Sequence, residues 1–456
     1  MAKDTEEKEK EFAPDQEIDF CTMGMFIVGK SLLLSRPVRH CKSYHNRREC
    51  HSLQDAGERI KFSNEIHFLP PTPPVYDVLG GGGSYAALGA RFFSPPPLSK
   101  AISWVVDRGS DFPSSITNQI KAWQTSCLIR DDPSRLTTRG WNGYDSAENR
   151  AFKYSTPRLR LDERALPPSL LFSKSFHLIC NPKRCISLIT SILRKRKTID
   201  PRAEKPLFVW EPVPDLCIPN ELLNLTNALP YVDICSPNHA ELASLMGDPD
   251  LGIDPSRGKI SREAVERSCE QLLSGMPLQS YTLVIRCGSE GCYLAKNGGR
   301  SRRPSVVKRK RPANHARGGL TLDMDMEALF AGLLNGDMSF DREPVQIDPG
   351  LERWFPAYFE ENEQDRVVDP TGGGNGFLGA LAVALARGIA LEEAACWGSI
   401  SASLCIEQVG VPILGRGEDG KETWNGDRVD VRLQKFMKRV RVSTEGLLER
   451  GFGASG

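Results

Sequence analysis

The feature that most constrains the fold is a glycine loop, Asp369–Gly379, which stands directly before a helix of small residues. The loop reads Asp-Pro-Thr-Gly-Gly-Gly-Asn-Gly-Phe-Leu-Gly. Consecutive glycines let successive backbone N–H groups converge on one point, and the following helix directs its positive end to that point. The loop therefore predicts an anion cradle, suited to charge that develops during phosphoryl transfer. The alternative is a glycine turn needed only for close packing.

Short apolar runs alternate with helical or loop segments from Ser175 onward, which is typical of parallel strands joined by crossovers. The runs are FHLIC, PLFVW, YVDIC, TLVIRC and RVVD, and Phe20–Val28 is expected to be a buried first strand. We therefore expect an α/β protein with a mainly parallel central sheet and helices on both faces. Ligands should lie at the carboxyl ends of the strands.

Composition narrows the function mainly by exclusion. The chain has 456 residues and a net charge of +1, so it has no global attraction to nucleic acid or to anionic membranes. No apolar run approaches the roughly 20 residues that span a bilayer, and the charged first residues do not resemble a signal peptide. Thirteen cysteines without regular spacing do not describe a disulfide framework. We expect a soluble cytoplasmic protein with reduced thiols and no membrane partner.

Three further segments precede or follow the glycine loop in an ordered series. They are Ser236–Glu241 (SPNHAE), Val284–Gly291 (VIRCGSEG) and Trp397–Pro412 (WGSISASLCIEQVGVP). With the loop they resemble the motifs of the PfkB (ribokinase-like) carbohydrate kinases, in the order of that family. Arg286 stands where the family has threonine, and Ser399 where it often has asparagine.

This resemblance implies a ribokinase-like three-layer sandwich with a small β lid, formed from residues 65–79 and 123–156. It also implies ATP as cofactor, Mg²⁺ bound through water near Glu241, and a monovalent cation such as K⁺ near Asp369 and Thr371. Gly372, Gly373 and Gly374 would form the anion hole. The implied nucleotide-binding residues are Asn238, Glu241, Arg286, Gly288, Gly291 and Ser399. Asn238 and Glu241 share one helical face at i, i+3, although a plain helix start is the better explanation of this motif taken alone.

A second glycine run lies in the N-terminal half, at the place of the family's first glycine signature. Its members Gly80, Gly81, Gly82 and Ser84 are the residues that the resemblance implies for substrate binding, with Ser84 at the position of an asparagine that binds sugar hydroxyls. A serine can still bond a hydroxyl but lacks the two-sided amide. The alternative is a helix-opening turn without a ligand.

One departure from the family concerns mechanism. The family's catalytic aspartate takes a proton from the substrate hydroxyl, and this chain has Asn375 at that base position. An amide is not basic, and general-base catalysis contributes about 10²–10⁴-fold, so we expect slow or absent phosphorylation of a sugar or related alcohol. The alternative function is a nucleotide-binding pseudokinase that serves as a scaffold for a protein partner. Trp210–Asp215 (WEPVPD), Asn375 and the basic residues around 300–317 resemble the fungal maintenance-of-killer branch.

The predicted organisation is a charged tail at residues 1–19 and a kinase-like domain at 20–450. Residues 29–64 read as an insertion, and Gly-Lys-Ser at its start is compatible with a splice-donor sequence, so we hypothesise a retained intron. Its histidines and cysteines do not have standard zinc spacing. Residues 296–363 are expected to form a polar surface insertion. Its run 300–311 has seven basic residues in twelve. We expect a solvated loop, with nuclear localisation as the alternative; nucleic acid is not expected, because no aromatic residues are interleaved for base stacking.

Overall fold

The computed structural model describes residues 17–31, 75–144, 150–300 and 347–452. Their largest feature is a nine-stranded sheet with the order β17-β14-β13-β10-β9-β8-β1-β4-β5. Every pair from β13 to β5 is parallel, and β14 and β17 are added antiparallel at one edge. The bounds are β1 (Phe20–Thr22), β4 (Ile102–Arg108), β5 (Ser126–Asp131), β8 (Ser175–Cys180), β9 (Leu207–Pro212), β10 (Ile234–Cys235), β13 (Thr282–Arg286), β14 (Cys292–Lys296) and β17 (Leu351–Phe355). The predicted, mainly parallel central sheet is confirmed.

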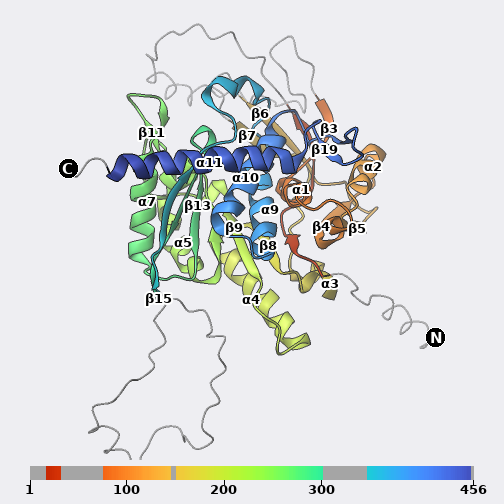
Figure 1. The fold of residues 1–456 in the computed structure, drawn as a ribbon. Coiled ribbons are helices and arrows are strands. Elements are labelled where there is room, and N and C mark those ends of the chain that lie inside the picture. Colours follow the sequence, from red (N-terminus) through yellow and green to blue (C-terminus); the bar gives the residue numbers. More distant parts are fainter. Residues whose placement is uncertain (1–16, 32–74, 145–149, 301–346, 453–456) are drawn as a thin grey trace, which may run out of the picture.

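Helices cover both faces of this sheet, because successive strand residues point to opposite sides. Phe20 faces one apolar core and its neighbour Cys21 faces the other. The first core is covered by α1 (Gly82–Phe92), α2 (Ser114–Ala122), α9 (Gly373–Ala386), α10 (Leu391–Ile406) and α11 (Val429–Phe452). The second is covered by α3 (Pro168–Leu171), α4 (Pro182–Ile199), α5 (Leu222–Ala228), α6 (His239–Leu245) and α7 (Arg262–Gly275). The result is a three-layer α/β sandwich, in which α11 lies across α10 (Figure 1).

A separate four-stranded sheet, here called the lid sheet, has the order β3-β2-β6-β7. Its strands are β2 (Ile27–Ser31), β3 (Val75–Gly80), β6 (Arg139–Tyr144) and β7 (Arg150–Tyr154). It lies at the top of the view in Figure 1. Arg139 joins it to the main body, since Nε donates to Asp111 Oδ2 at 2.5 Å while Nη1 donates to Asp77 in β3 at 2.9 Å. The small second sheet that was predicted is therefore present.

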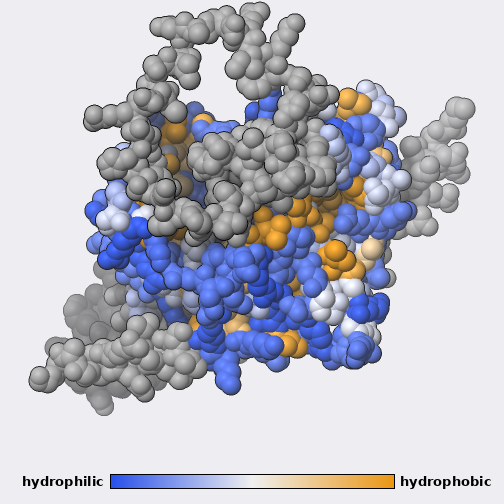
Figure 2. Space-filling view, turned by 90° about the horizontal axis from the view of Figure 1, so that it is seen from above, coloured by the Kyte–Doolittle hydropathy of each residue, from blue (hydrophilic) through white to orange (hydrophobic). Residues whose placement is uncertain are grey.

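Three short strand pairs lie outside these two sheets in the described residues. They are β11 (Ile253–Asp254) with β12 (Lys259–Ile260), β15 (Gly299–Arg300) with β16 (Ile347–Asp348), and β18 (Leu414–Arg416) with β19 (Glu422–Trp424). Figure 2 looks onto the end of the molecule that carries the lid sheet, and hydrophobic residues gather there near the middle of the view. Among the described helices, none combines the length and apolar character that crossing a membrane requires.

Four predictions about the elements need correction. Phe20–Val28 is not one strand: β1 belongs to the central sheet and β2 to the lid sheet, because the chain turns at Gly24, whose N–H donates to the Thr22 hydroxyl. β5 lies within the range 123–156 predicted for the lid, yet it pairs with β4. β17 lies within the predicted insertion 296–363, yet it pairs with β14. RVVD is not a strand, since a 3₁₀ helix over Glu361–Arg366 precedes an irregular connection.

Several of the remaining predictions concern segments that lie largely outside the described residues. These segments are the charged tail, most of residues 29–64 and the basic run after Arg300. The first residues of the 29–64 segment, up to Ser31, continue β2 and pair with β3 and β6.

Candidate functional site

The carboxyl ends of the central strands converge on one buried cluster of polar side chains. We call it the Glu211 cluster, and its members are His177 from β8, Glu211 from β9, Arg286 from β13, Glu241 from α6 and Asn375 from α9. This is the edge of an open parallel sheet at which ligands generally bind.

The predicted glycine loop forms the start of α9. Gly372 adopts a left-handed conformation, with φ of +82°, and a Cβ added there would lie 2.3 Å from the Tyr85 ring. Asp369 is buried and its Oδ1 accepts the backbone N–H of Thr371 at 2.9 Å, which holds the turn. The N–H groups of the first helical turn have no acceptor within a helix, and they point out of the N-terminal end of α9.

Gly374 is the place where this loop meets the charged cluster. A Cβ at Gly374 would lie 2.1 Å from Nη1 of Arg286, so only glycine lets the guanidinium approach the first turn this closely. A cation therefore lies against the N-terminal end of α9. The combination of helix N–H groups and a guanidinium is well suited to bind an anion such as phosphate.

Asn375 points its amide nitrogen at a carboxylate. Its Nδ2 donates to Glu211 Oε2 at 2.6 Å. The same nitrogen lies 3.2 Å from the position that a Cβ on Gly82 would occupy, so the second glycine run reaches the same corner. The base position of the family is thus occupied by a donor, and a carboxylate from another strand lies next to it.

Glu211 is the centre of the cluster. Its Oε1 lies 2.9 Å from Nη1 of Arg286, and its Oε2 lies 3.5 Å from Nε2 of His177. Burial alone would raise the pKa of Glu211, but the charge of Arg286, the adjacent His177 and the hydrogen bond from Asn375 outweigh burial and lower that pKa. Glu211 is therefore ionised at neutral pH.

The orientation of His177 follows from its neighbours. The Thr22 hydroxyl lies 3.1 Å from Nδ1 of His177 and already accepts the N–H of Gly24. If the hydroxyl donates its proton to Nδ1, the proton of a neutral ring is on Nε2, which faces Glu211 at 3.5 Å.

Arg286 connects both carboxylates of the cluster. Its Nη2 donates to the carbonyl of Ser236 at 2.9 Å and lies 3.6 Å from Glu241 Oε2. Burial would lower the pKa of Arg286, but Glu211 and Glu241 outweigh burial and raise it, so the guanidinium keeps its charge. Its Nε is buried and has no hydrogen-bond partner among the described residues.

Asn238 and Glu241 form a reciprocal capping box at the start of α6. Asn238 Oδ1 accepts the N–H of Glu241, and Glu241 Oε2 accepts the N–H of Asn238, both at 2.8 Å. This arrangement is the helix start that was the alternative explanation of the motif. The described residues contain no group of three or more Asp, Glu, His or Cys side chains arranged to hold a metal ion. They do not fit a magnesium ion held directly by the protein.

The other predicted residues take up supporting positions. Gly81, with φ of +91°, joins β3 to α1, and the buried Ser84 hydroxyl donates to the carbonyl of Gly80 at 2.8 Å. Gly288 and Gly291 have positive φ in the turn after β13. Ser399 is buried in α10, and none of the cluster's hydrogen bonds or ion pairs within the described chain involves it.

Sequence reasoning missed Glu211 and His177 as members of the site. A signal was present for Glu211, because it directly follows the apolar run of β9 and lies where a parallel strand ends. For His177 the signal is weaker, since a buried histidine within a strand is compatible with a purely structural position.

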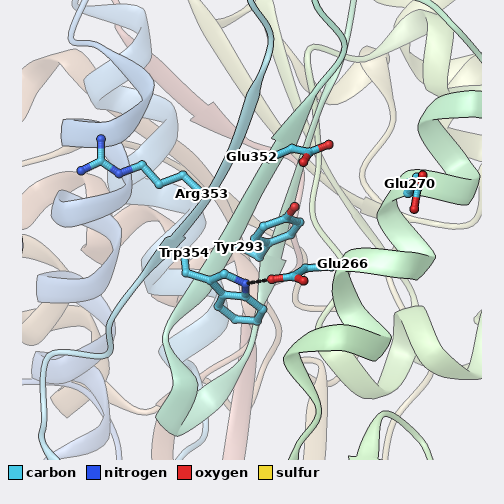
Figure 3. Close-up of a pocket in the computed structure, with 6 residues that line it drawn as sticks. All are labelled: Glu266, Glu270, Tyr293, Glu352, Arg353 and Trp354. Carbon is cyan, nitrogen blue, oxygen red and sulfur yellow. Dashed lines mark hydrogen bonds between the residues drawn. The ribbon is translucent and has the colours of Figure 1, made fainter. Parts of the chain in front are cut away.

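The structure also contains a surface hollow that does not suit a nucleotide. It measures about 410 Å³ and is lined by Glu266, Glu270, Tyr293, Glu352, Arg353 and Trp354 (Figure 3). Arg353 points away from the three carboxylates, and Glu266 accepts the Trp354 indole N–H at 2.7 Å. Its three carboxylates would repel a phosphate, so this hollow is not a candidate site for a nucleotide.

Solved structures similar in fold are ribokinases. A ribokinase from Giardia lamblia has a TM-score of 0.54 and 15% identity, over 92% of this chain and 100% of that one. A ribokinase from Cryptococcus neoformans, in complex with ADP, has a TM-score of 0.52 and 13% identity, over 87% and 96% of the two chains. A putative ribokinase II from E. coli, in complex with ATP and Mg²⁺, has a TM-score of 0.50 and 13% identity, over 92% and 99%. The fold is therefore ribokinase-like.

Curated relatives with higher identity are fungal proteins. An uncharacterised protein of Schizosaccharomyces pombe is 28% identical, over 93% of this chain and 94% of that protein. Protein MAK32 of Saccharomyces cerevisiae is 31% identical, over 84% of this chain and 90% of that protein. No protein-family model matches the chain. From its identity to MAK32, the chain belongs to the MAK32 (maintenance of killer) family, whose member here has a ribokinase-like fold.

Proposed function

We propose that the protein binds ATP and transfers its γ-phosphoryl group to a hydroxyl of a sugar or related alcohol. The observation that carries this proposal is the meeting of Gly374, Arg286 and Glu211 at the N-terminal end of α9. Gly82 of the second glycine run lies beside Asn375 at the same corner, which supports a substrate position between the two runs.

The residues of the chain would act mainly through position and charge. Phosphoryl transfer has little covalent chemistry for a protein to perform, so its catalysis depends on alignment and on stabilising charge at the transferred group. The N–H groups at the start of α9 and the guanidinium of Arg286 would stabilise that charge. The complex of the putative E. coli ribokinase II with ATP and Mg²⁺ supports these two as cofactors. Because the described donors do not hold a metal directly, Mg²⁺ would arrive with the nucleotide. A site for K⁺ near Asp369 and Thr371 stays a prediction.

A second candidate function is a pseudokinase that binds nucleotide and stabilises a protein partner. The observation that favours it is that Asn375 and Arg286 are both already bound to Glu211, the former by a hydrogen bond and the latter by an ion pair. In this function ATP would displace the ion pairs without reacting. Both functions are consistent with the predicted cytoplasmic location, where ATP is abundant.

The experiment that separates them incubates the purified chain with ATP, Mg²⁺ and a panel of sugars and polyols, and measures ADP formation and phosphorylated product. Thermal unfolding with and without ATP is measured in parallel, because a ligand that binds the native state raises the melting temperature. Turnover supports the kinase. Stabilisation by ATP without turnover on any member of the panel supports the pseudokinase, and absence of any ATP effect contradicts both.

A further inference from the structure

We propose that Glu211, and not residue 375, is the proton acceptor of the reaction, and that Asn375 positions its carboxylate. This inference rests on the proposed kinase function and assigns the missing base of that site. Glu211 reaches the corner from the end of β9, whereas residue 375 lies in the first turn of α9. The corner therefore keeps one carboxylate, carried by a different element.

The pairing of Asn375 with Glu211 explains why an amide is present. The two side chains are 2.6 Å apart. Two carboxylates at this distance would share one proton, because like charges at contact strongly raise one of the two pKa values. An amide donor avoids that conflict and keeps Glu211 ionised. The substitution at position 375 is thus matched to Glu211, and it does not simply remove a function.

Among the described residues, the side chains that face Glu211 keep its carboxylate in the charged form. Arg286 faces Oε1 from β13, while His177 from β8 and Asn375 from α9 face Oε2. Glu241 lies beyond Arg286 and shares its charge. Burial raises the pKa of the nearby Cys217 thiol to about 12, so that group is neutral. The carboxylate is therefore an acceptor held in position by Arg286 and Asn375, with His177 packed beside it.

Nucleotide binding would increase the basicity of this carboxylate. A phosphate entering the N-terminal end of α9 competes with Glu211 for the guanidinium of Arg286, because both anions need the same donors. Glu211 then loses the cation that most stabilises its charged form, and its affinity for a proton rises.

The step then balances as follows. The substrate oxygen forms a bond to the γ-phosphorus of ATP, and the bond from that phosphorus to the β–γ bridging oxygen breaks. The proton of the hydroxyl passes to Glu211, the bridging electron pair leaves with ADP, and Arg286 stays with the transferred phosphoryl group.

The test compares four variants with the wild type: Glu211→Gln, Asn375→Asp, the swap of both, and Glu422→Gln. Glu422 is a control outside the site, because it is a glutamate that likewise pairs with an arginine, here in a bidentate pair with the fully buried Arg91. The readouts are kcat and KM on the best substrate of the panel, and ATP-induced stabilisation.

We expect Glu211→Gln to lower kcat by about 10²–10⁴-fold while ATP still raises the melting temperature, since a lost general base has an effect of that size. The kcat of the double variant should be at least tenfold higher than that of Glu211→Gln alone, because the double variant again has one carboxylate and one amide at the same corner. Glu422→Gln should keep kcat within about twofold.

Three outcomes would overturn the proposal in distinguishable ways. If the wild type turns over and Glu211→Gln keeps its kcat, Glu211 is not the base and the proposed function stands. If the wild type has no turnover on the panel, the kinase function and the role of Glu211 both fail. A Glu211→Gln variant that loses ATP stabilisation, with no recovery in the swap, would make Glu211 purely structural.

Discussion

At the scale of single residues, burying the charges of the Glu211 cluster costs free energy, and this cost favours a functional role for the cluster. Taking charges out of water costs several kcal/mol per ion unless each is paired and hydrogen-bonded. Both oxygens of Glu211 have partners, yet Arg286 Nε has none among the described residues. A buried donor without a partner is typical of a functional site, whereas an ion pair that only stabilises the fold usually has all its donors satisfied.

The lowered pKa of Glu211 predicts a pH-dependent contribution to stability. A carboxylate whose pKa is lower in the folded state stabilises the fold above its unfolded pKa, and this contribution is lost as the pH falls through the folded value. The free energy of unfolding of the wild type should therefore exceed that of Glu211→Gln most at neutral pH, and the difference should shrink below the ordinary pKa of 4.5. Urea unfolding of both proteins from pH 7 to pH 3.5 measures this. A difference that stays constant over that range would contradict the ionised state of Glu211.

The contact between Gly374 and Arg286 yields a second prediction. Gly374→Ala should destabilise the protein by about 1–3 kcal/mol, because a new methyl group must displace a buried guanidinium. It should also weaken stabilisation by ATP. A double-mutant cycle with Arg286→Met isolates the cause. In a protein that already lacks the guanidinium, Gly374→Ala should lower the free energy of unfolding much less. Additive effects of the two substitutions would show that the methyl group clashes elsewhere.

These residues also show which parts of the site can be predicted from the sequence and which cannot. The glycine loop was found from local spacing, because a glycine turn and its helix are adjacent in the chain. The hydrogen bond from Asn375 to Glu211 joins residues 164 positions apart, so no local pattern encodes it. Asn375 was correctly singled out as an unusual residue, but its partner needed the sheet order that brings the end of β9 to α9.

At the scale of elements, the two helices that follow the glycine runs pack unusually closely. A Cβ on Gly379 of α9 would lie 1.9 Å from the Ala86 carbonyl oxygen of α1, and one on Gly89 of α1 would lie 2.1 Å from that of Gly376. The packing explanation of the C-terminal glycine loop therefore applies to part of the loop, and the anion cradle stays a prediction for the rest. Gly374 makes room for Arg286, whereas Gly376 and Gly379 allow helix packing.

Gly379→Ala tests the packing role. In an exposed helix this substitution stabilises by up to about 1 kcal/mol, because alanine has the higher helix propensity. Here we expect a loss of about 1–3 kcal/mol, since the methyl group meets a neighbouring backbone that cannot move aside. Gly275→Ala is the control, because a Cβ at this helical glycine of α7 would have no heavy atom within 4 Å. Chemical denaturation of both variants measures the difference, and equal stability would contradict the close packing.

The wrong element predictions share a cause. β17 has Glu352 and Arg353 in its centre, as expected of an edge strand that avoids aggregation by charge, and this polarity made it resemble a surface loop. RVVD is apolar like the true strands, yet Val368 donates its N–H to the Ile406 carbonyl at the end of α10. Apolar character alone does not separate a strand from a connection that packs on a helix.

At the scale of the whole molecule, the site is assembled from segments that lie far apart in the sequence. Its five side chains come from three parallel strands and two helices, on segments between β8 and α9. Residues 301–346 lie within this span, outside the described chain. The strands on either side of them bring their ends together, because Arg300 pairs with Ile347 and Gly299 with Asp348.

This pairing predicts that residues 301–346 can be replaced by an Asn-Gly turn without loss of the fold. A two-residue turn closes an antiparallel pair with the correct twist, and a shorter loop also lowers the entropy cost of closure. The melting temperature and the response to ATP should equal those of the full chain.

A comparison variant joins Lys296 to Leu351 with the same turn, which β14 and β17 also allow. It should lose about 1–2 kcal/mol, because the bonds from Gln279 to the Gly298 carbonyl and from Asn297 to the Leu273 carbonyl are removed. If the first variant were as unstable as the second, or no longer responded to ATP, residues 301–346 would be part of the folded core or of the site.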